Sequence, residues 1–195
     1  MDKTTDLRVS RTHKLIKEAF FELMETVGFE KISVQALTKK AMVSRTTFYL
    51  HYRDKYDLLD QIEEEMLEGL KDMAVGTPIE IVMTEGLSGE KPFALLSRIY
   101  EYVEKNQAFF KLIMGENGDP SFFHKLYEAI KRTASLSIDF DRLKIPEHYA
   151  IAFIIGIHTS IIAEWLKTGL KETPQEIASM IAEVMGDAPK NLYEP

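Results

Sequence analysis

The sequence of 195 residues contains no cysteine. That absence excludes a disulfide framework, a thiolate metal site and a cysteine nucleophile. The zinc-protease motif HExxH, a phosphate-binding glycine loop and the GxSxG motif of serine hydrolases are absent as well. We therefore expect no enzymatic activity, and no metal or other cofactor.

Long hydrophobic runs are also missing. The most apolar stretch, residues 150–163, is shorter than the roughly 20 residues that cross a bilayer, and His158, Thr159 and Ser160 interrupt it. The N-terminal segment MDKTTDLRVSRTHK is polar and lacks the apolar centre of a signal peptide. We expect a cytoplasmic protein without a membrane partner.

Positively charged residues are fewer than negatively charged ones, so the formal net charge is −7. Its distribution is uneven, since residues 1–60 carry 11 Lys and Arg against 9 Asp and Glu, whereas the remainder carries 13 against 22. The first part is therefore at +2 and the rest at −9. This asymmetry favours a mildly basic contact module on an acidic body, although +2 is a small electrostatic footprint.

Strand-like alternation is absent, and apolar residues recur with helical spacing along most of the chain. Ser33, Ser44, Asp54 and Thr173 are suited to cap helices, and Gly28 to end one. Residues 76–89 lack helical rhythm and are expected to be a linker or loop. Helices are predicted at residues 15–27, 34–40, 44–50, 54–73, 92–115 with a break near Asn106, 120–136, 146–169 and from 173 onward.

Two short helices joined by a three-residue turn, at residues 34–50, are typical of a helix-turn-helix. In that motif the second helix lies in the DNA major groove and the first braces it across the backbone. The apolar positions are spaced to form the small core between the helices. These positions are Val34, Leu37, Ala41, Val43 and Phe48.

The run from Ile32 to Leu59 resembles the signature of the TetR family of regulators, and the match extends over about residues 8–68. The elements that carry it are the cap Ser33, the turn Ala41-Met42-Val43-Ser44, the pairs Phe48-Tyr49 and His51-Tyr52, and the link Arg53-Asp54-Lys55. Two positions depart from the family pattern. Met42 stands where glycine is common and is strained if φ is positive, and Leu50 replaces a commonly polar residue.

The resemblance implies which side chains contact DNA. Arg45 is the candidate for a bidentate guanine contact, and Tyr49 matches a position that holds a phosphate. The alternatives are that Tyr49 is an ordinary half-exposed tyrosine and that Arg45 and Lys55 are solvated charges. The full set of expected DNA contacts is Ser33, Ser44, Arg45, Thr46, Thr47, Tyr49, His51 and Lys55.

The helix expected at residues 146–169 is apolar nearly all round, so it must be buried on two sides. One side suits its own subunit and the other a second subunit. The family resemblance implies a two-fold dimer built from this helix and the next, with a monomer as the alternative. The expected interface residues are Ile154, Ile161, Trp165, Ile177, Met180, Ile181 and Val184.

The middle helices are rich in aromatic residues. In the TetR family such helices surround a ligand cavity, whereas aromatic stripes in general fill interiors, so core packing is the alternative. His158 is a polar group on the most apolar helix, and buried polar groups need partners. The candidate pocket residues are Tyr100, Phe110, Met114, Phe123, Tyr127 and His158.

These patterns together predict an all-α protein: a three-helix DNA-binding head (residues 8–68) joined to a larger helical ligand-binding and dimerisation domain (residues 69–195). The resemblance implies a nucleoid-associated repressor that binds a palindromic operator as a homodimer. Double-stranded DNA, a second copy and a small-molecule effector are the expected partners. The alternative is a co-activator or chromosome-organising factor that acts through a protein partner, because the same head serves such roles in the family. Residues 102–123 also resemble the C-terminal domain of a subgroup from low-GC Gram-positive bacteria that includes activators.

Overall fold

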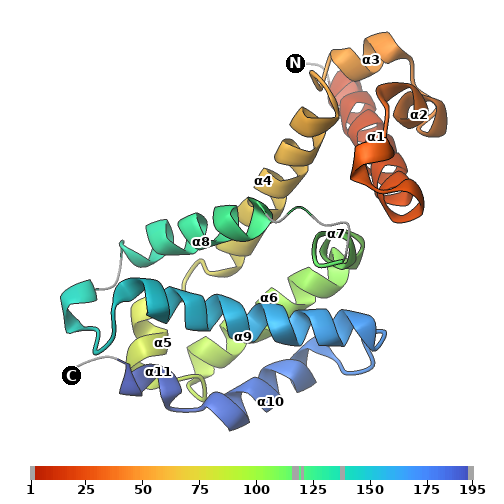
Figure 1. Cartoon of the computed structure of the whole chain (residues 1–195). Helices are drawn as coiled ribbons and strands as arrows, with labels where there is room; N and C mark the ends of the chain where they lie inside the picture. Colours follow the sequence, from red (N-terminus) through yellow and green to blue (C-terminus); the bar gives the residue numbers. More distant parts are fainter. Residues whose placement is uncertain (1–2, 116–118, 120, 137–138, 193–195) are drawn as a thin grey trace. The chain divides into compact units, whose positions relative to one another are not determined.

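The computed structural model describes residues 3–115, 119, 121–136 and 139–192 of the chain (Figure 1). Among these residues every regular element is a helix, which confirms the all-α prediction. The α-helices are α1 (Lys3–Val27), α2 (Val34–Lys40), α3 (Arg45–Tyr49), α4 (Lys55–Met73), α5 (Ile79–Glu85), α6 (Glu90–Lys105), α7 (Gln107–Ile113), α8 (Ser121–Ala134), α9 (Glu147–Lys167), α10 (Pro174–Met185) and α11 (Ala188–Asn191); η1 (Phe29–Lys31) and η2 (Phe140–Arg142) are 3₁₀ turns.

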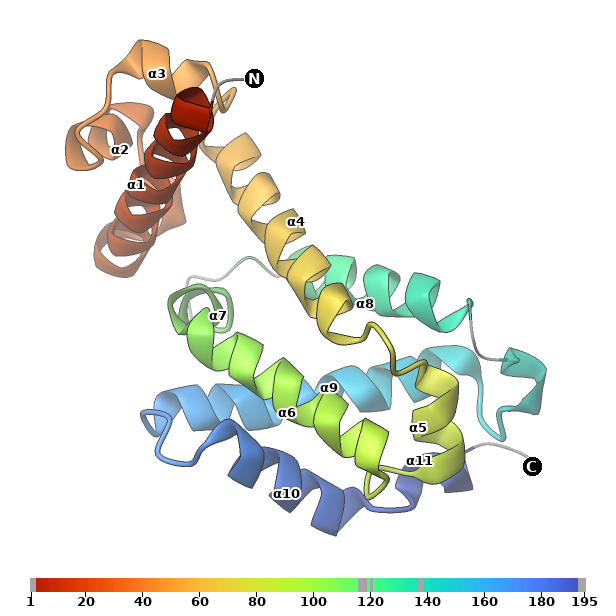
Figure 2. The same cartoon turned by 180° about the vertical axis from the view of Figure 1, so that it is seen from behind.

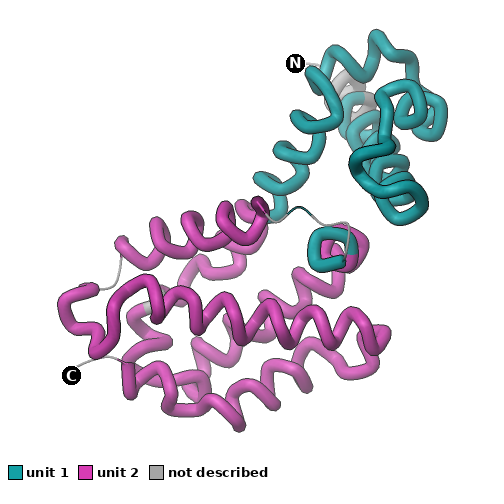
Figure 3. The backbone as a smooth tube through the Cα atoms, viewed as in Figure 1, with its two compact units in different colours: residues 1–66, 112–119 teal, residues 67–111, 120–195 magenta. Residues whose placement is uncertain are grey.

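The chain divides into two compact units (Figure 3). The first, here called the head, holds residues 1–66 and 112–119; the second, called the body, holds residues 67–111 and 120–195. Helix α4 crosses the boundary between Met66 and Leu67. Nothing in the sequence pattern indicated that residues 112–119 belong with the head.

The short helices of the head begin at the capping residues expected from the sequence. Ser33 Oγ accepts a hydrogen bond from the backbone N–H of Ala36 at 3.2 Å, which caps α2. Ser44 Oγ accepts from the N–H of Thr47 at 2.9 Å and caps α3. Asp54 accepts from the first N–H groups of α4. Each cap satisfies a donor that the helix itself leaves unpaired, and so fixes where the helix begins.

The head encloses its own hydrophobic core. Phe48 of α3 is fully buried, as predicted, and so is Leu37 of α2. Side chains of α1 and α4 are buried as well, and their packing holds α2 and α3 against these two longer helices. The other buried side chains of this core include Ile16, Ala19, Phe20, Met24, Ile32, Ala41, Tyr52, Leu58, Leu59 and Ile62.

In the body, α6 packs along α10, and α8 along α9 (Figure 2). The ring of Tyr100, on α6, is fully buried and lies edge-on to Trp165 of α9, with 5.8 Å between ring centroids. Thr173 caps α10 as predicted, and it forms a capping box with Glu176. Large aromatic side chains therefore fill the interior between these helices.

The expectation of a linker at residues 76–89 is wrong, because α5 occupies its centre. Met83 of α5 is buried together with Ala134 of α8, so tertiary burial stabilises a helix whose sequence has little periodicity. Gly86 ends α5 at φ 72°, and a Cβ atom there would lie 2.8 Å from the carbonyl oxygen of Gly186. The adjacent N–H of Leu87 donates to that oxygen at 2.8 Å. Glycine is therefore required at this close approach.

Three side chains that the sequence assigned to a dimer interface are buried in the body, and a fourth is half-buried there. Trp165, Ile177 and Ile181 are buried, and the indole N–H of Trp165 donates to the carbonyl oxygen of Glu172 at 2.9 Å. Ile154 is half-buried against the cluster around Met83. The correction has a simple cause: an apolar stripe does not reveal whether its own chain or another one covers it.

The other three expected interface residues remain at the surface of the protomer. Met180 and Val184 are exposed on α10, the latter by 82%, and Ile161 is half-buried on α9.

Helix α9 is long and apolar enough to cross a membrane by length and composition alone, with a mean hydropathy of 1.6. That criterion is weak, since core helices of soluble proteins also meet it. Only 28% of this stretch is buried within the protomer.

Candidate nucleic-acid interface

Helix α3 presents a row of hydrogen-bonding groups to solvent. Ser44, Arg45, Thr46 and Tyr49 are exposed, whereas Thr47 is half-buried. The buried ring of Phe48 fixes the other face of the helix, and α2 packs against α3. The structure therefore holds one face of a short helix rigidly and leaves its polar face open.

Three of the expected contact residues also shape the helix ends. The oxygens of Ser33 and Ser44 accept backbone N–H groups, and the hydroxyls of Ser44 and Thr47 lie 2.8 Å apart. The Ser33 hydroxyl still has its proton to donate, whereas Ser44 and Thr47 use one of their two hydroxyl protons in the bond between them. These groups are thus oriented by the caps at the start of α2 and α3, where helix dipoles favour an anion.

The guanidinium of Arg45 donates to the side-chain oxygen of Gln35 at 3.2 Å. Gln35 lies in the first turn of α2, and both side chains are exposed. Sequence reasoning did not identify Gln35, because the two residues are ten positions apart and meet only through the crossing of two helices. The pair restricts the orientation of the side chain best suited to read guanine.

Lys55 is placed differently from an ordinary solvated charge. Its Nζ donates to the carbonyl oxygens of Phe29 and Glu30, both at 3.0 Å, and lies 4.6 Å from the centre of the Phe29 ring. An ammonium group has three donors, so one remains for a further partner. Lys55 therefore ties the start of α4 to η1, and its contact with phosphate stays a prediction.

His51 belongs to a cluster that the sequence did not reveal. Its ring centroid lies 4.5 Å from that of His13 on α1, and His13 Nδ1 lies 2.6 Å from the hydroxyl oxygen of Tyr52. Burial raises the pKa of Tyr52 to about 12, with Glu65 and Asp57 adding to the effect. Burial lowers the pKa of His13, and the nearby His51 and Lys17 lower it further.

Both departures from the family pattern lie on the surface of the head. Met42 has φ 53° and is 86% exposed, so the positive φ that would strain a residue other than glycine is present. Leu50 follows α3 and is 76% exposed. Together with Tyr49 they add exposed apolar surface close to α3.

The candidate pocket residues occupy two kinds of position in the structure. Tyr100 and Phe110 are buried in packed interiors, and the Tyr100 hydroxyl lies 2.9 Å from His158 Nδ1. Burial lowers the pKa of His158 to about 4, so its ring is neutral near pH 7. The half-buried members are Met114, Phe123, Tyr127 and His158. For Tyr100 and Phe110 the structure therefore shows core packing.

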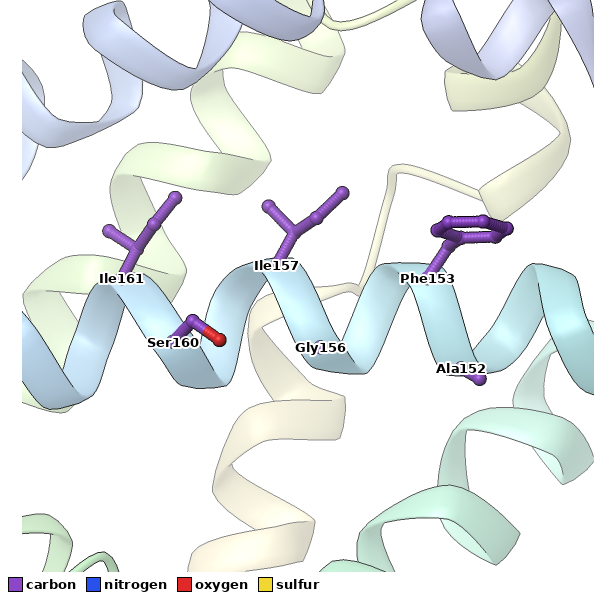
Figure 4. Close-up of a pocket in the computed structure, with 6 residues that line it drawn as sticks. All are labelled: Ala152, Phe153, Gly156, Ile157, Ser160 and Ile161. Atoms are coloured by element: carbon purple, nitrogen blue, oxygen red, sulfur yellow. The ribbon is translucent and has the colours of Figure 1, made fainter.

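An open groove of about 480 Å³ runs along α9 and involves none of those six residues (Figure 4). Phe153, Ile157 and Ile161 project from one side of the helix. Small residues follow the adjacent stripe of the helix. The large apolar side chains thus form a ridge beside a shallow channel. The groove is lined by Ala152, Phe153, Gly156, Ile157, Ser160 and Ile161.

Comparison with known families matches both parts of the chain. Residues 16–62 match the family described as bacterial regulatory proteins, tetR family. Residues 90–187 match a family described as transcriptional regulator C-terminal region. The first match includes α2, α3 and every expected DNA-contact residue.

Two similar proteins are described as HTH-type transcriptional regulators, one of them an activator. The uncharacterized HTH-type transcriptional regulator YxbF of Bacillus subtilis is 23% identical over 180 residues, 91% of this chain and 45% of that protein. The HTH-type dhaKLM operon transcriptional activator DhaS of Lactococcus lactis is 28% identical over 103 residues, 52% of this chain and 48% of that protein. The matched part thus spans about half the length of these two relatives.

A solved structure shares the fold over nearly the whole chain. The TetR transcriptional regulator from Streptococcus agalactiae superposes with a TM-score of 0.61 at 22% identity, covering 93% of this chain and 97% of that one.

Proposed function

Because the chain belongs to the TetR family of bacterial transcriptional regulators, we propose that it is a ligand-responsive repressor that binds a palindromic operator as a homodimer. The observation that carries the proposal is the exposed polar face of α3, held by Phe48 and braced by α2. A recognition helix needs such a rigid mount, since base contacts depend on side-chain positions.

The roles of the head residues follow from their chemistry. Arg45, oriented by Gln35, donates to a guanine edge in the major groove. Thr46 reaches a base edge or a thymine methyl group. Tyr49 and His51 bind phosphates and set the register of the head on the duplex. Ser33, Ser44, Thr47 and Lys55 add phosphate contacts from the helix ends.

The homodimer is proposed to form through the groove on α9. Phe153 is 59% exposed, a large apolar surface for a monomer to leave in water. A Cβ atom on Gly156 would meet nothing within 4 Å, so packing within the protomer does not require a glycine there. A second α9 could lay its ridge beside this channel, and a two-fold axis would make the arrangement reciprocal. Met180 and Val184 on α10 supply further exposed apolar surface.

A small-molecule effector would act within the body. The Tyr100–His158 hydrogen bond lies beside the ring of Trp165, and a ligand with a polar group would bind by taking Tyr100's place as the partner of half-buried His158. The relative DhaS is described as an activator, so the sign of regulation is determined by the reporter assay below. Action mainly through a protein partner is not favoured by the exposed polar face of α3.

Selection of bound fragments from a randomised DNA library tests the proposal. We expect enrichment of an inverted repeat whose half-sites are centred about 34–36 Å apart or a multiple of that spacing. A reporter gene placed behind the selected sequence then gives the sign, with lower expression in the presence of the protein expected for a repressor. Failure to enrich any sequence contradicts specific DNA binding, and enrichment of an unrepeated site contradicts the dimeric mode.

A further inference from the structure

Two side chains occupy the centre of the exposed face of α3. The buried ring of Phe48 marks the face of this helix that packs on the core of the head. An α-helix turns by about 100° per residue, so Thr46 and Leu50 each lie roughly 160° around the axis from Phe48. The backbone N–H of Leu50 donates to the carbonyl oxygen of Thr46 at 3.1 Å, which extends the helical geometry to Leu50. Thr46 and Leu50 are therefore neighbours on the face opposite the core.

Arg45 and Tyr49 lie beside this central face rather than in it. By the same rotation they are about 60° and 100° around the axis from Phe48. The guanidinium of Arg45 is also held at α2, where it donates to Gln35. Leu50 is 76% exposed, compared with 57% for Tyr49. If α3 enters the major groove with the face opposite its core, Leu50 is directed at the bases.

The surroundings of Leu50 indicate what it contacts. A single exposed leucine is ordinary on a protein surface, so its exposure alone indicates no partner. Residues 33–55, however, carry five Lys and Arg and one acidic residue, Asp54, a formal net charge of +4 on a chain whose total is −7. Positive charge around one aliphatic side chain suits the major groove, where phosphates border a floor of base edges and methyl groups.

We propose that Leu50 is a specificity-determining residue that contacts the C5 methyl group of a thymine in each half-site, with the methyl group of Thr46 beside it. The inference rests on the proposed function. Thymine is the one base that presents a methyl group in the major groove. Leucine has neither donor nor acceptor, so against another base edge it would leave polar groups dehydrated and unpaired. Leu50 therefore favours thymine over cytosine, which places an amino group there.

The geometry of α3 also indicates where this thymine lies. Arg45 and Leu50 are separated by about 7.5 Å along the helix axis, which corresponds to roughly two base-pair steps for a helix that lies along the groove. The selected half-site should therefore contain a thymine within about three base pairs of the guanine that Arg45 reads.

Deoxyuridine tests the contact directly, because it lacks the C5 methyl group of thymidine and keeps all of its hydrogen-bonding groups. Fluorescence anisotropy gives the dissociation constants of the full chain for the selected duplex and for duplexes in which each thymine in turn is replaced in both half-sites. We expect one position near that guanine at which the affinity of the wild-type protein falls about fourfold per half-site, the effect of one buried methyl group.

Three variants assign this loss to a side chain. Leu50→Ala should bind the thymine duplex about fourfold more weakly per half-site and should bind the thymine and deoxyuridine duplexes equally. Leu50→Met keeps an apolar side chain of similar volume and should retain the preference for thymine. Leu136→Ala, at an exposed leucine of the body, is the matched control and should behave as the wild type does.

The outcomes separate this inference from the proposed function. A wild-type protein that enriches no DNA sequence contradicts the function itself. Specific binding that no deoxyuridine substitution weakens, or a preference for thymine that survives Leu50→Ala, overturns the inference alone. A Leu50→Ala protein that binds DNA as the wild type does but no longer regulates a reporter gene would assign Leu50 to a protein partner, and also overturns it.

Discussion

The amide oxygen of Gln35 accepts a hydrogen bond from the guanidinium of Arg45 at 3.2 Å, and so couples the bracing helix α2 to the recognition helix α3. Arg45 has many rotamers, and fixing one of them lowers the entropy lost when it binds a base. We therefore expect Gln35 to contribute to base recognition without contacting the base itself.

A double-mutant cycle tests this coupling on the DNA selected by the wild-type protein. Arg45→Ala should cost about 1–3 kcal/mol of binding free energy at one base pair per half-site and relax the preference there. Gln35→Ala should cost about 0.5–1.5 kcal/mol at the same base pair. In the Arg45→Ala background Gln35→Ala should have little further effect. Additive losses, or losses equal on all sequences, would show that the two residues act independently.

The exposed ridge on α9 predicts the effect of a charge at the proposed dimer interface. Phe153→Asp should shift the protein from dimer to monomer in sedimentation velocity, because a buried unpaired carboxylate costs several kcal/mol. The helical circular dichroism should be unchanged, since Phe153 is exposed in the protomer. Leu136→Asp, at an exposed apolar position of the body outside α9, is a matched control. A Phe153→Asp protein that remains dimeric would place the interface elsewhere.

His158 predicts a loss of stability in acid. Its pKa is lowered to about 4 by burial, compared with 6.5 for an unfolded chain. The unfolded state therefore binds a proton more readily, and the native state is favoured above pH 6.5 and progressively less so as the pH falls toward 4. The shift corresponds to about 3 kcal/mol at most. Urea unfolding of wild type and His158→Gln at pH 7 and pH 4.5 measures it. An equal pH dependence of the two proteins would show that other groups cause the loss.

A side chain added at Gly69 on α4 should clash with a neighbouring side chain inside the body. A Cβ atom there would lie 2.1 Å from the hydroxyl oxygen of Tyr102 and 2.4 Å from its Cζ. Gly69→Ala should therefore displace the Tyr102 ring and destabilise the protein by about 1–3 kcal/mol, although alanine is the better helix former. Tyr102→Ala should remove this penalty in the double variant. A stabilised Gly69→Ala single variant would mean that the ring moves aside freely.

The head was largely predictable from the sequence, because its signals are local. Ser33, Ser44 and Asp54 cap the helices that they precede, and Phe48 is buried at the spacing that predicted it. The Gln35–Arg45 hydrogen bond and the contact of His13 with Tyr52 were not predictable, since they depend on how helices cross. Periodicity specifies which face of a helix is apolar but does not identify the residues of another helix that face it.

The body was predicted less completely for a related reason. Trp165 and Ile177 were assigned to an interface because their helices are apolar, yet neighbouring helices of the same chain cover them. Helix α5 was missed because its stability comes from the burial of Met83 rather than from its own propensity. Composition predicts how much apolar surface must be covered, and only the tertiary structure shows what covers it.

The central claim is that α3 reads a specific DNA sequence. Its most direct test is the ratio of dissociation constants of the wild-type protein for the selected duplex and for a scrambled duplex of equal length, measured by fluorescence anisotropy at 150 mM salt. Specific recognition predicts a ratio of about 10³ or more, which Arg45→Ala reduces. Equal affinity for the two duplexes would contradict the account.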